Sequence, residues 1–253
     1  MAKYKQECIF GIRAVIEAIQ QEKEIDKVML KQGIRGELFQ QLFTMIRENN
    51  IPFQYVPEEV FKPFADRNHQ GVLAEVAPVP YQDLTEILDR VEAEGKVPFI
   101  LILDRITDVR NFGAIVRSAE CAGVDAVVIP NKNSAKISSD ALKTSAGALY
   151  HLPVCRILNL KKLVRELKFQ RGIRVYAATE KAEKFYTGVD MTLPTAIIMG
   201  SEDKGVDEGL LNIATDCIKI PQKGQIESLN VSAAAAVMMF EAVRQRGNAP
   251  DSM

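Results

Sequence analysis

After Pro98 the chain alternates short apolar runs with longer amphipathic stretches, and this alternation restricts the possible folds more than any other feature. The run "FILILD" at 99–104 has no polar face, which is typical of a strand buried on both sides in a parallel sheet. The pattern therefore predicts an α/β domain, and its spacing favours the doubly wound type. Its predicted strands lie at 99–104, 126–130, 153–157, 174–179, 195–200 and 217–221, and its predicted helices lie at 111–123, 139–149, 160–170 and 207–214, followed by a long terminal helix.

A second, shorter alternation comes first and predicts a small N-terminal α/β domain over residues 1–79. The stretch 80–97 lies between prolines and is acidic, and we expect it to be a linker with one helix. Residues 98–246 form the larger predicted domain, and 247–253 a tail. The N-terminal domain is predicted to contain helices at 11–21 and 37–50, strands at 27–31, 51–56 and 71–79, and a short helix from Pro57.

Composition limits the function classes. Hydrophobic residues make up 47% and charged residues 26% of the 253 residues, with a net charge of −1, which argues against a strongly basic nucleic-acid binder. Residues 98–253 nevertheless carry 20 Lys and Arg against 17 Asp and Glu, which permits an anionic partner. No secretion signal or membrane span is evident, and the four cysteines are widely spaced. We therefore expect a cytoplasmic protein without a membrane partner, a disulfide framework or a metal site.

Polar residues gather after three of the predicted strands, where ligands of open α/β sheets bind. In "LDRITDVRNFGAIVR", Asn111 stands where a helix N-cap belongs, and Arg117 points away from the apolar stripe of its helix. In "IIMGSEDKGV", Gly200 and Gly205 flank Glu202. Taken alone, Asn111 and Arg117 are best explained as a capping Asn and a solvated Arg, and the segment around Glu202 is explained as well by a simple turn.

The third cluster opens the terminal helix in "IPQKGQIESLNVS". Ser228 could cap this helix through its hydroxyl group. Asn230, expected inside the first turn, is a poor helix former whose amide is suited to directed hydrogen bonds. The chain contains neither a P-loop nor a GxGxxG fingerprint, which disfavours a dinucleotide-binding oxidoreductase.

The three clusters occur in the order N-x-G-x-x-x-R, G-x-E-x-x-G and I-P-x-x-G-x-x-x-S-L-N-x-S. Together they resemble the signature motifs of the SpoU (TrmH) branch of the SPOUT RNA 2′-O-ribose methyltransferases, over roughly residues 98–246. Residues 1–79, with "IFGIRAVIEAI" and "NHQGVLAEV", look like the RNA-binding domain of the family's ribosomal RNA members. Arg13 stands where many relatives have His, so the contribution of that position is open.

The resemblance implies methyl transfer from S-adenosylmethionine to a ribose 2′-hydroxyl by a homodimer. It also implies a deep trefoil knot, with the terminal helix buried in the knot and against a second subunit. The catalytic residues would be Arg117, Asn111, Glu202, Ser228 and Asn230, and the cofactor would contact Gly200, Ile220 and Leu229. No metal is implied.

The expected substrate is RNA rather than DNA, and a guanosine of large-subunit ribosomal RNA is preferred because relatives with this N-terminal extension modify one. A tRNA ribose is the alternative within the same chemistry. A non-catalytic RNA-binding or ribosome-assembly protein is the alternative outside it. A basic surface for RNA could be built from loop residues that are otherwise ordinary solvated charges: Arg105, Arg110, Lys132, Lys136 and Lys143.

Overall fold

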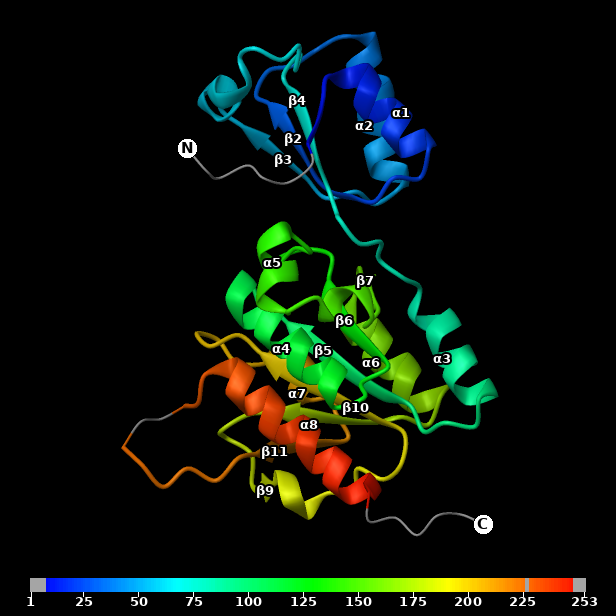
Figure 1. Cartoon of the computed structure of the whole chain (residues 1–253), viewed down its shortest axis with the longest axis vertical. Coiled ribbons are helices and arrows are strands. Elements are labelled where there is room, and N and C mark those ends of the chain that lie inside the picture. The colour runs from blue at the N-terminus through cyan, green and yellow to red at the C-terminus, as the bar shows by residue number, and fades with distance from the viewer. Residues whose placement is uncertain (1–7, 226–227, 248–253) are drawn as a thin grey trace. The chain divides into compact units, whose positions relative to one another are not determined.

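The computed structural model describes residues 8–225 and 228–247, and the chain divides into two compact units (Figure 1). The first unit runs to Pro80 and includes Lys136–Ser139. The second comprises Tyr81–Ala135 and the chain from Asp140 onward.

The first unit is a four-stranded sheet with strand order β1-β4-β2-β3. Two helices pack on one face, where their apolar residues share a core with alternate residues of β2 and β4. A 3-10 helix covers part of the other face through Phe61. The elements are β1 (Cys8–Phe10), α1 (Ile12–Gln20), β2 (Ile25–Lys31), α2 (Glu37–Glu48), β3 (Phe53–Val56), η1 (Glu58–Phe64) and β4 (Val72–Val76).

The two N-terminal motifs form one local structure at the start of α1. The Ile12 amide donates to Gln70 Oε1 at 3.2 Å, which satisfies a backbone donor at the helix N-terminus. Gly11 has a φ of +88°, and a Cβ there would lie 2.9 Å from the Asn68 carbonyl oxygen. Position 11 therefore requires glycine. Arg13 is exposed two residues further on.

The second unit is a seven-stranded sheet with strand order β7-β6-β5-β10-β8-β11-β9, and all its strand pairs are parallel. The order differs from the doubly wound pattern suggested by spacing, because β10 lies between β5 and β8. The strands are β5 (Phe99–Asp104), β6 (Ala126–Pro130), β7 (Val154–Ile157), β8 (Arg174–Ala178), β9 (Lys184–Phe185), β10 (Thr195–Gly200) and β11 (Asp216–Lys219). Thr195 to Met199 are fully buried, which suits β10 to a central place.

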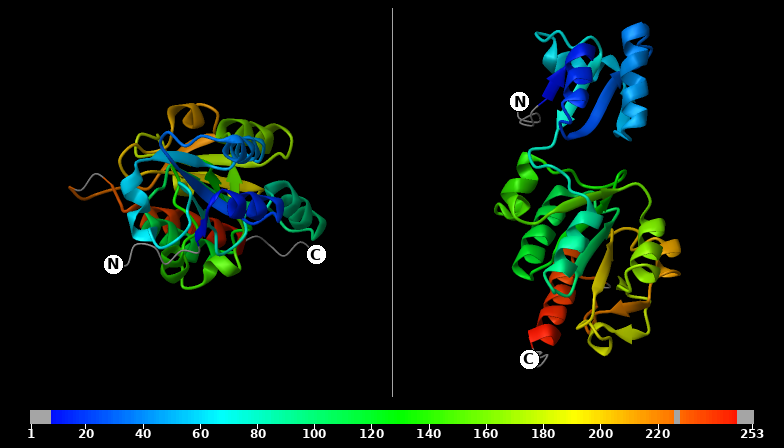
Figure 2. Two further views of the ribbon diagram at one scale, coloured as in Figure 1. Left: turned by 90° about the horizontal axis from the view of Figure 1, so that it is seen from above. Right: turned by 90° about the vertical axis from the view of Figure 1, so that its right-hand side faces the viewer.

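Helices cover both faces of this sheet (Figure 2). On one face α3, α6 and α7 share a core with residues such as Ile100, Val128 and Ile198. On the other face α8 packs along α4 and β10. The helices are α3 (Leu84–Ala93), α4 (Val109–Cys121), α5 (Ser139–Thr144), α6 (Leu160–Phe169), α7 (Glu208–Leu211) and α8 (Val231–Gly247), with the 3-10 turns η2 (Ala148–Tyr150) and η3 (Tyr186–Gly188).

The stretch 80–97, expected as a linker, contains helix α3, whose Leu84, Ile87, Leu88 and Val91 are buried in the core of the second unit. Because these residues contribute to that core, the segment belongs to the larger unit from Tyr81 onward. Of the expected tail, only Gly247, the last residue of α8, lies within the described residues.

Several smaller observations concern the chain as a whole. All four cysteines are free thiols, and burial raises the pKa of the Cys155 thiol to about 12. Among residues 8–225 and 228–247, no helix is long and apolar enough to cross a membrane. Within the same residues, no cluster of three or more His, Cys, Asp or Glu side chains could hold a metal ion.

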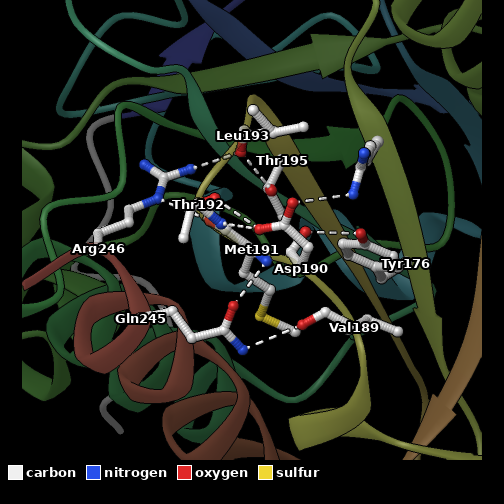
Figure 3. Close-up of polar contacts among 10 residues, drawn as sticks. Tyr176, Val189, Asp190, Met191, Thr192, Leu193, Thr195, Gln245 and Arg246 are labelled. Atoms are coloured by element: carbon white, nitrogen blue, oxygen red, sulfur yellow. Dashed lines mark hydrogen bonds and ion pairs between the residues drawn. The ribbon is translucent and has the colours of Figure 1, made fainter. Parts of the chain in front are cut away.

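The end of α8 is fixed to the segments that precede the two central strands, β5 and β10, and Figure 3 shows its contacts with the segment before β10. Gln245 Nε2 donates to the Val189 carbonyl at 3.1 Å, and Gln245 Oε1 accepts from the Met191 amide at 2.8 Å. The Arg246 guanidinium stacks over Phe99, 4.8 Å from the ring centroid. It also donates to the backbone carbonyls of Val97, Pro98, Met191 and Leu193, at 3.0 to 3.2 Å. One side chain thus joins α8 to the segments that precede β5 and β10.

Replacing Arg246 by Ala should lower the free energy of unfolding by about 2–4 kcal/mol, because it removes four hydrogen bonds to backbone carbonyls and the stacking on the buried Phe99 ring. The measurement is the unfolding midpoint in urea. Arg165, exposed on α6, provides a matched control, since Arg165→Ala should leave the midpoint unchanged. Equal midpoints for the two variants would contradict this role for Arg246.

Candidate active site

Asn111 reaches the candidate site from the first turn of α4. This helix begins at Val109, and its N-cap is Asp108, whose Oδ1 accepts from the Asn111 amide at 2.7 Å. The prediction that Asn111 is the N-cap is therefore wrong, because another capping residue stands three positions earlier. Since Asp108 caps the helix, the Asn111 side chain is available for contacts with other segments.

Glu202 is presented by a tight turn after β10. The Gly205 amide donates to the Ser201 carbonyl at 2.8 Å, and Gly205 has a φ of +62°. A Cβ on Gly200 would lie only 2.1 Å from the Gly205 carbonyl carbon. Because glycine has no side chain, the two ends of the turn can approach each other closely.

The side chains of Asn111, Glu202 and Asn230 form one hydrogen-bonded network. Glu202 Oε1 accepts from Asn111 Nδ2 at 3.3 Å, from Asn230 Nδ2 at 2.7 Å and from the Val231 amide at 3.3 Å. Asn230 Nδ2 also donates to Asn111 Oδ1 at 3.0 Å. The three polar clusters of the sequence therefore meet. The Glu202 carboxylate also lies at the start of α8, where the helix dipole favours negative charge.

Asn230 also caps α8. Helix α8 begins at Val231, and Asn230 Oδ1 accepts from the Ser232 amide at 3.0 Å and from the Ser232 hydroxyl. The cap is thus Asn230 rather than Ser228, and Asn230 precedes the first turn instead of lying inside it. With its oxygen used by the helix and its nitrogen by the network, the amide has a defined orientation.

A cavity of about 350 Å³ lies beyond the carboxyl ends of β8, β10 and β11, beside this network. Gly200, Ile220 and Leu229, the predicted cofactor residues, all line it, as do Glu202 and Ser228. Its other walls include Thr179, Glu180, Lys181, Ser201, Asp203, Lys204, Ile218, Lys219 and Met238. The residues after β8 were missed by sequence reasoning, because only the strand order reveals that β8 lies next to β10.

Among the described residues, Arg117 is the predicted site residue that the single chain brings neither to the cavity wall nor to the Asn111–Glu202–Asn230 network. It is exposed on α4, and its side chain has no hydrogen bond or ion pair among the described residues. Asn111, on the same helix, contacts the network but is not part of the cavity wall.

Comparison with known proteins places the chain in a family. The model of the SpoU rRNA Methylase family matches residues 98–240. A second family model, RNA 2′-O ribose methyltransferase substrate binding, matches residues 8–82. The chain belongs to the SpoU family of RNA methyltransferases. Enzymes of this family use S-adenosylmethionine.

Whole-length relatives agree with the assignment. The chain is 34% identical over 239 residues, covering 94% of it and 95% of the relative, to YacO of Bacillus subtilis (strain 168), whose name places it among TrmH family tRNA/rRNA methyltransferases. A crystal structure described as an RNA 2′-O ribose methyltransferase is 26% identical, with a TM-score of 0.56 and coverage of 96% and 89%. The SpoU methyltransferase AviRb of Streptomyces viridochromogenes, solved with AdoMet, shares the fold at 23% identity and a TM-score of 0.60, with coverage of 95% and 90%.

The two tasks of Asn230 are separable by substitution. Asn230→Ala removes both the cap and the network, whereas Asn230→Ser keeps a good capping group without the amide donor. We expect both variants to lose methyl transfer by tenfold or more. The Ser variant should be more stable than the Ala variant by about 1 kcal/mol. Denaturant titration and a methyl-transfer assay on both proteins test this, and normal turnover in the Ser variant would reduce Asn230 to a cap.

Proposed function

We propose that the protein transfers the methyl group of S-adenosylmethionine to a ribose 2′-hydroxyl of structured RNA, and that its substrate is a guanosine of large-subunit ribosomal RNA. The observation that carries the proposal is the Asn111–Glu202–Asn230 network at the edge of a cavity lined by Gly200, Ile220 and Leu229. Residues from all three sequence motifs thus lie together where the methyl donor and the ribose that accepts the methyl group would meet.

The cavity fits the donor in size and in chemistry. A volume of about 350 Å³ is in the range of small-molecule sites. Ile218, Ile220 and Leu229 offer apolar contact for an adenine ring, while Glu180 and Asp203 offer carboxylates to a positively charged donor. Gly200, Ile220 and Leu229 would hold it. When bound, S-adenosylmethionine supplies a methyl group that is already electrophilic.

The residues of the chain then have to orient the ribose and ease the loss of the 2′-hydroxyl proton. Asn111 and Glu202 present polar atoms beside the cavity, and Asn230 holds both in place. Ser228, exposed at the cavity wall, would complete the network around the acceptor. Arg117 would stabilise negative charge developing on the 2′-oxygen. A guanidinium does not give up its proton in proteins, so Arg117 would act through its charge rather than as the base.

We further propose that the enzyme is a homodimer. Helix α8 exposes Val237, Phe240 and Val243, each 36 to 46% accessible, although its other side is core. Large apolar side chains that gather on one helix face favour a protein interface. A second copy on this face would also explain why Arg117 is absent from the cavity of its own chain, since Arg117 would complete the partner's site.

The family resemblance also leads us to propose the trefoil knot. The insertion of β10 between β5 and β8 supports it, because the chain must return to the middle of a sheet that it has already begun to extend on both sides. In this arrangement one side of α8 packs in the core of its own chain, and the other side contacts the second copy.

The first unit is proposed to bind the RNA. Its match to a substrate-binding family model supports this role. Because A-form helices hide their base edges, the target would be a loop or bulge with unstacked nucleotides. The names of the relatives mention tRNA as well as rRNA, so a tRNA ribose is the second candidate. With such a substrate the enzyme would work in the cytoplasm.

Deletion of the gene should remove one 2′-O-methyl group from large-subunit ribosomal RNA, as read by mass-spectrometric mapping. The purified protein with labelled S-adenosylmethionine should restore that group on RNA from the deleted strain. A missing methyl group in tRNA instead would select the tRNA candidate. Absence of S-adenosylmethionine binding by calorimetry would favour a non-catalytic assembly protein.

Arg117→Ala should lower turnover by roughly 10²-fold, the order lost with a group that stabilises charge in the transition state. Folding and donor affinity should stay close to those of the wild type, because Arg117 is exposed and lies outside the cavity wall. Single-turnover kinetics and calorimetry measure the two effects. Arg165→Ala serves as the control, and unchanged turnover in the Arg117 variant would remove this residue from the mechanism.

A further inference from the structure

Arg105, the residue after β5, has a backbone conformation that suits glycine better. Its φ is +59°, one of six positive values among the described non-glycine residues. A left-handed conformation is unfavourable for a residue with a Cβ, and such strain persists only where surrounding contacts hold it. Position 105 follows the end of a central strand, at the edge of the sheet where the cavity lies.

The Arg105 guanidinium connects two parts of the site. Its Nη2 lies 3.1 Å from Asp104 Oδ2 and donates to the Gly205 carbonyl at 3.3 Å, while Nε donates to Asp104 Oδ2 at 3.2 Å. Asp104 is only 5% exposed, and the same Oδ2 accepts from the Asp207 amide at 2.8 Å. Asp104 and Arg105 together therefore bind the backbone of the turn at two points, Gly205 and Asp207.

The bound turn is the one that carries Glu202. Residues 201–205 all line the cavity, whereas neither Asp104 nor Arg105 does. Contacts at Gly205 and Asp207 thus act on the cavity only through the position of the turn. Arg105 is also one of the residues expected to contribute to a basic surface for RNA, and its guanidinium is engaged by Asp104 and Gly205.

We propose that Arg105 is a positioning residue that holds the 201–207 turn in the geometry needed to bind the methyl donor. Glycine would adopt the same backbone conformation without strain but would supply no guanidinium. The side chain therefore contributes something that offsets the strain, and its contacts identify this as the fixing of the turn. The inference rests on the proposed function, since it assigns the cavity to S-adenosylmethionine.

Two variants separate strain from positioning. Arg105→Gly removes both the guanidinium and the strain, while Arg105→Ala removes the guanidinium and keeps the strain. Both should raise the Kd for S-adenosylmethionine about tenfold, the loss expected for charge-assisted hydrogen bonds. The Gly variant should melt roughly 2–4 °C above the Ala variant, because only the Ala variant keeps the strain. An equal loss of affinity in two variants of different stability would identify positioning of the turn rather than overall stability.

Glu22→Gly is the matched control, because Glu22 has a φ of +54° and lies in the first unit. It should raise the melting temperature by relieving backbone strain and leave the Kd unchanged.

Hydrogen exchange of the 202–207 amides without any ligand makes the test independent of the proposed function. Exchange there should be about tenfold faster in Arg105→Gly than in the wild type. Wild-type exchange in that variant, or a wild-type Kd, overturns the inference. If the wild-type protein itself binds no S-adenosylmethionine, the proposed function fails, and exchange alone decides whether Arg105 holds the turn.

Discussion

The site depends on one carboxylate oxygen. Glu202 Oε1 accepts from Asn111, Asn230 and the Val231 amide, and so joins segments that lie 91, 28 and 29 residues away in the sequence. Hydrogen bonds to an ionised acceptor are stronger than neutral ones, and a shared acceptor couples the three donors. The start of α8, the first turn of α4 and the turn after β10 are therefore positioned as a group.

The sheet makes this meeting possible. Parallel strands end at the same edge, and β5 and β10 pair in register from Phe99 with Thr195 to Asp104 with Gly200. The last residues of both strands thus lie side by side, and the segments that follow begin from neighbouring points. Asp104 extends this pairing beyond the strands, because its carboxylate binds the Asp207 amide across the edge. The pairing of β5 with β10 and the contact of Asp104 with Asp207 therefore both hold the turn after β10 next to the end of β5.

The sequence predicted best what depends on local pattern. The bounds of β5 and β10 were predicted to the residue, since continuous apolar runs leave little choice of state. Strands β1 and β9 were not predicted, because segments of three and two residues are too short to show a hydrophobic periodicity. The caps were misassigned where two capping residues lie within three positions, as with Asp108 and Asn111. Strand order is a long-range property, so neither the place of β10 nor the cavity wall after β8 could be predicted.

In the part of the single chain that the structure describes, the cavity lacks the guanidinium that the proposed mechanism requires. Within the described residues, the cavity wall has three lysines, three carboxylates and no arginine, and Arg117 is exposed without a partner. A developing oxyanion needs a fixed positive charge, and a lysine on a flexible stem is less well fixed than a planar guanidinium. Helix α8 borders the cavity at one end and exposes apolar residues further along. Because one helix carries both features, an interface built on it would bind the second copy and place that copy's side chains near the cavity, so assembly would be a condition of catalysis.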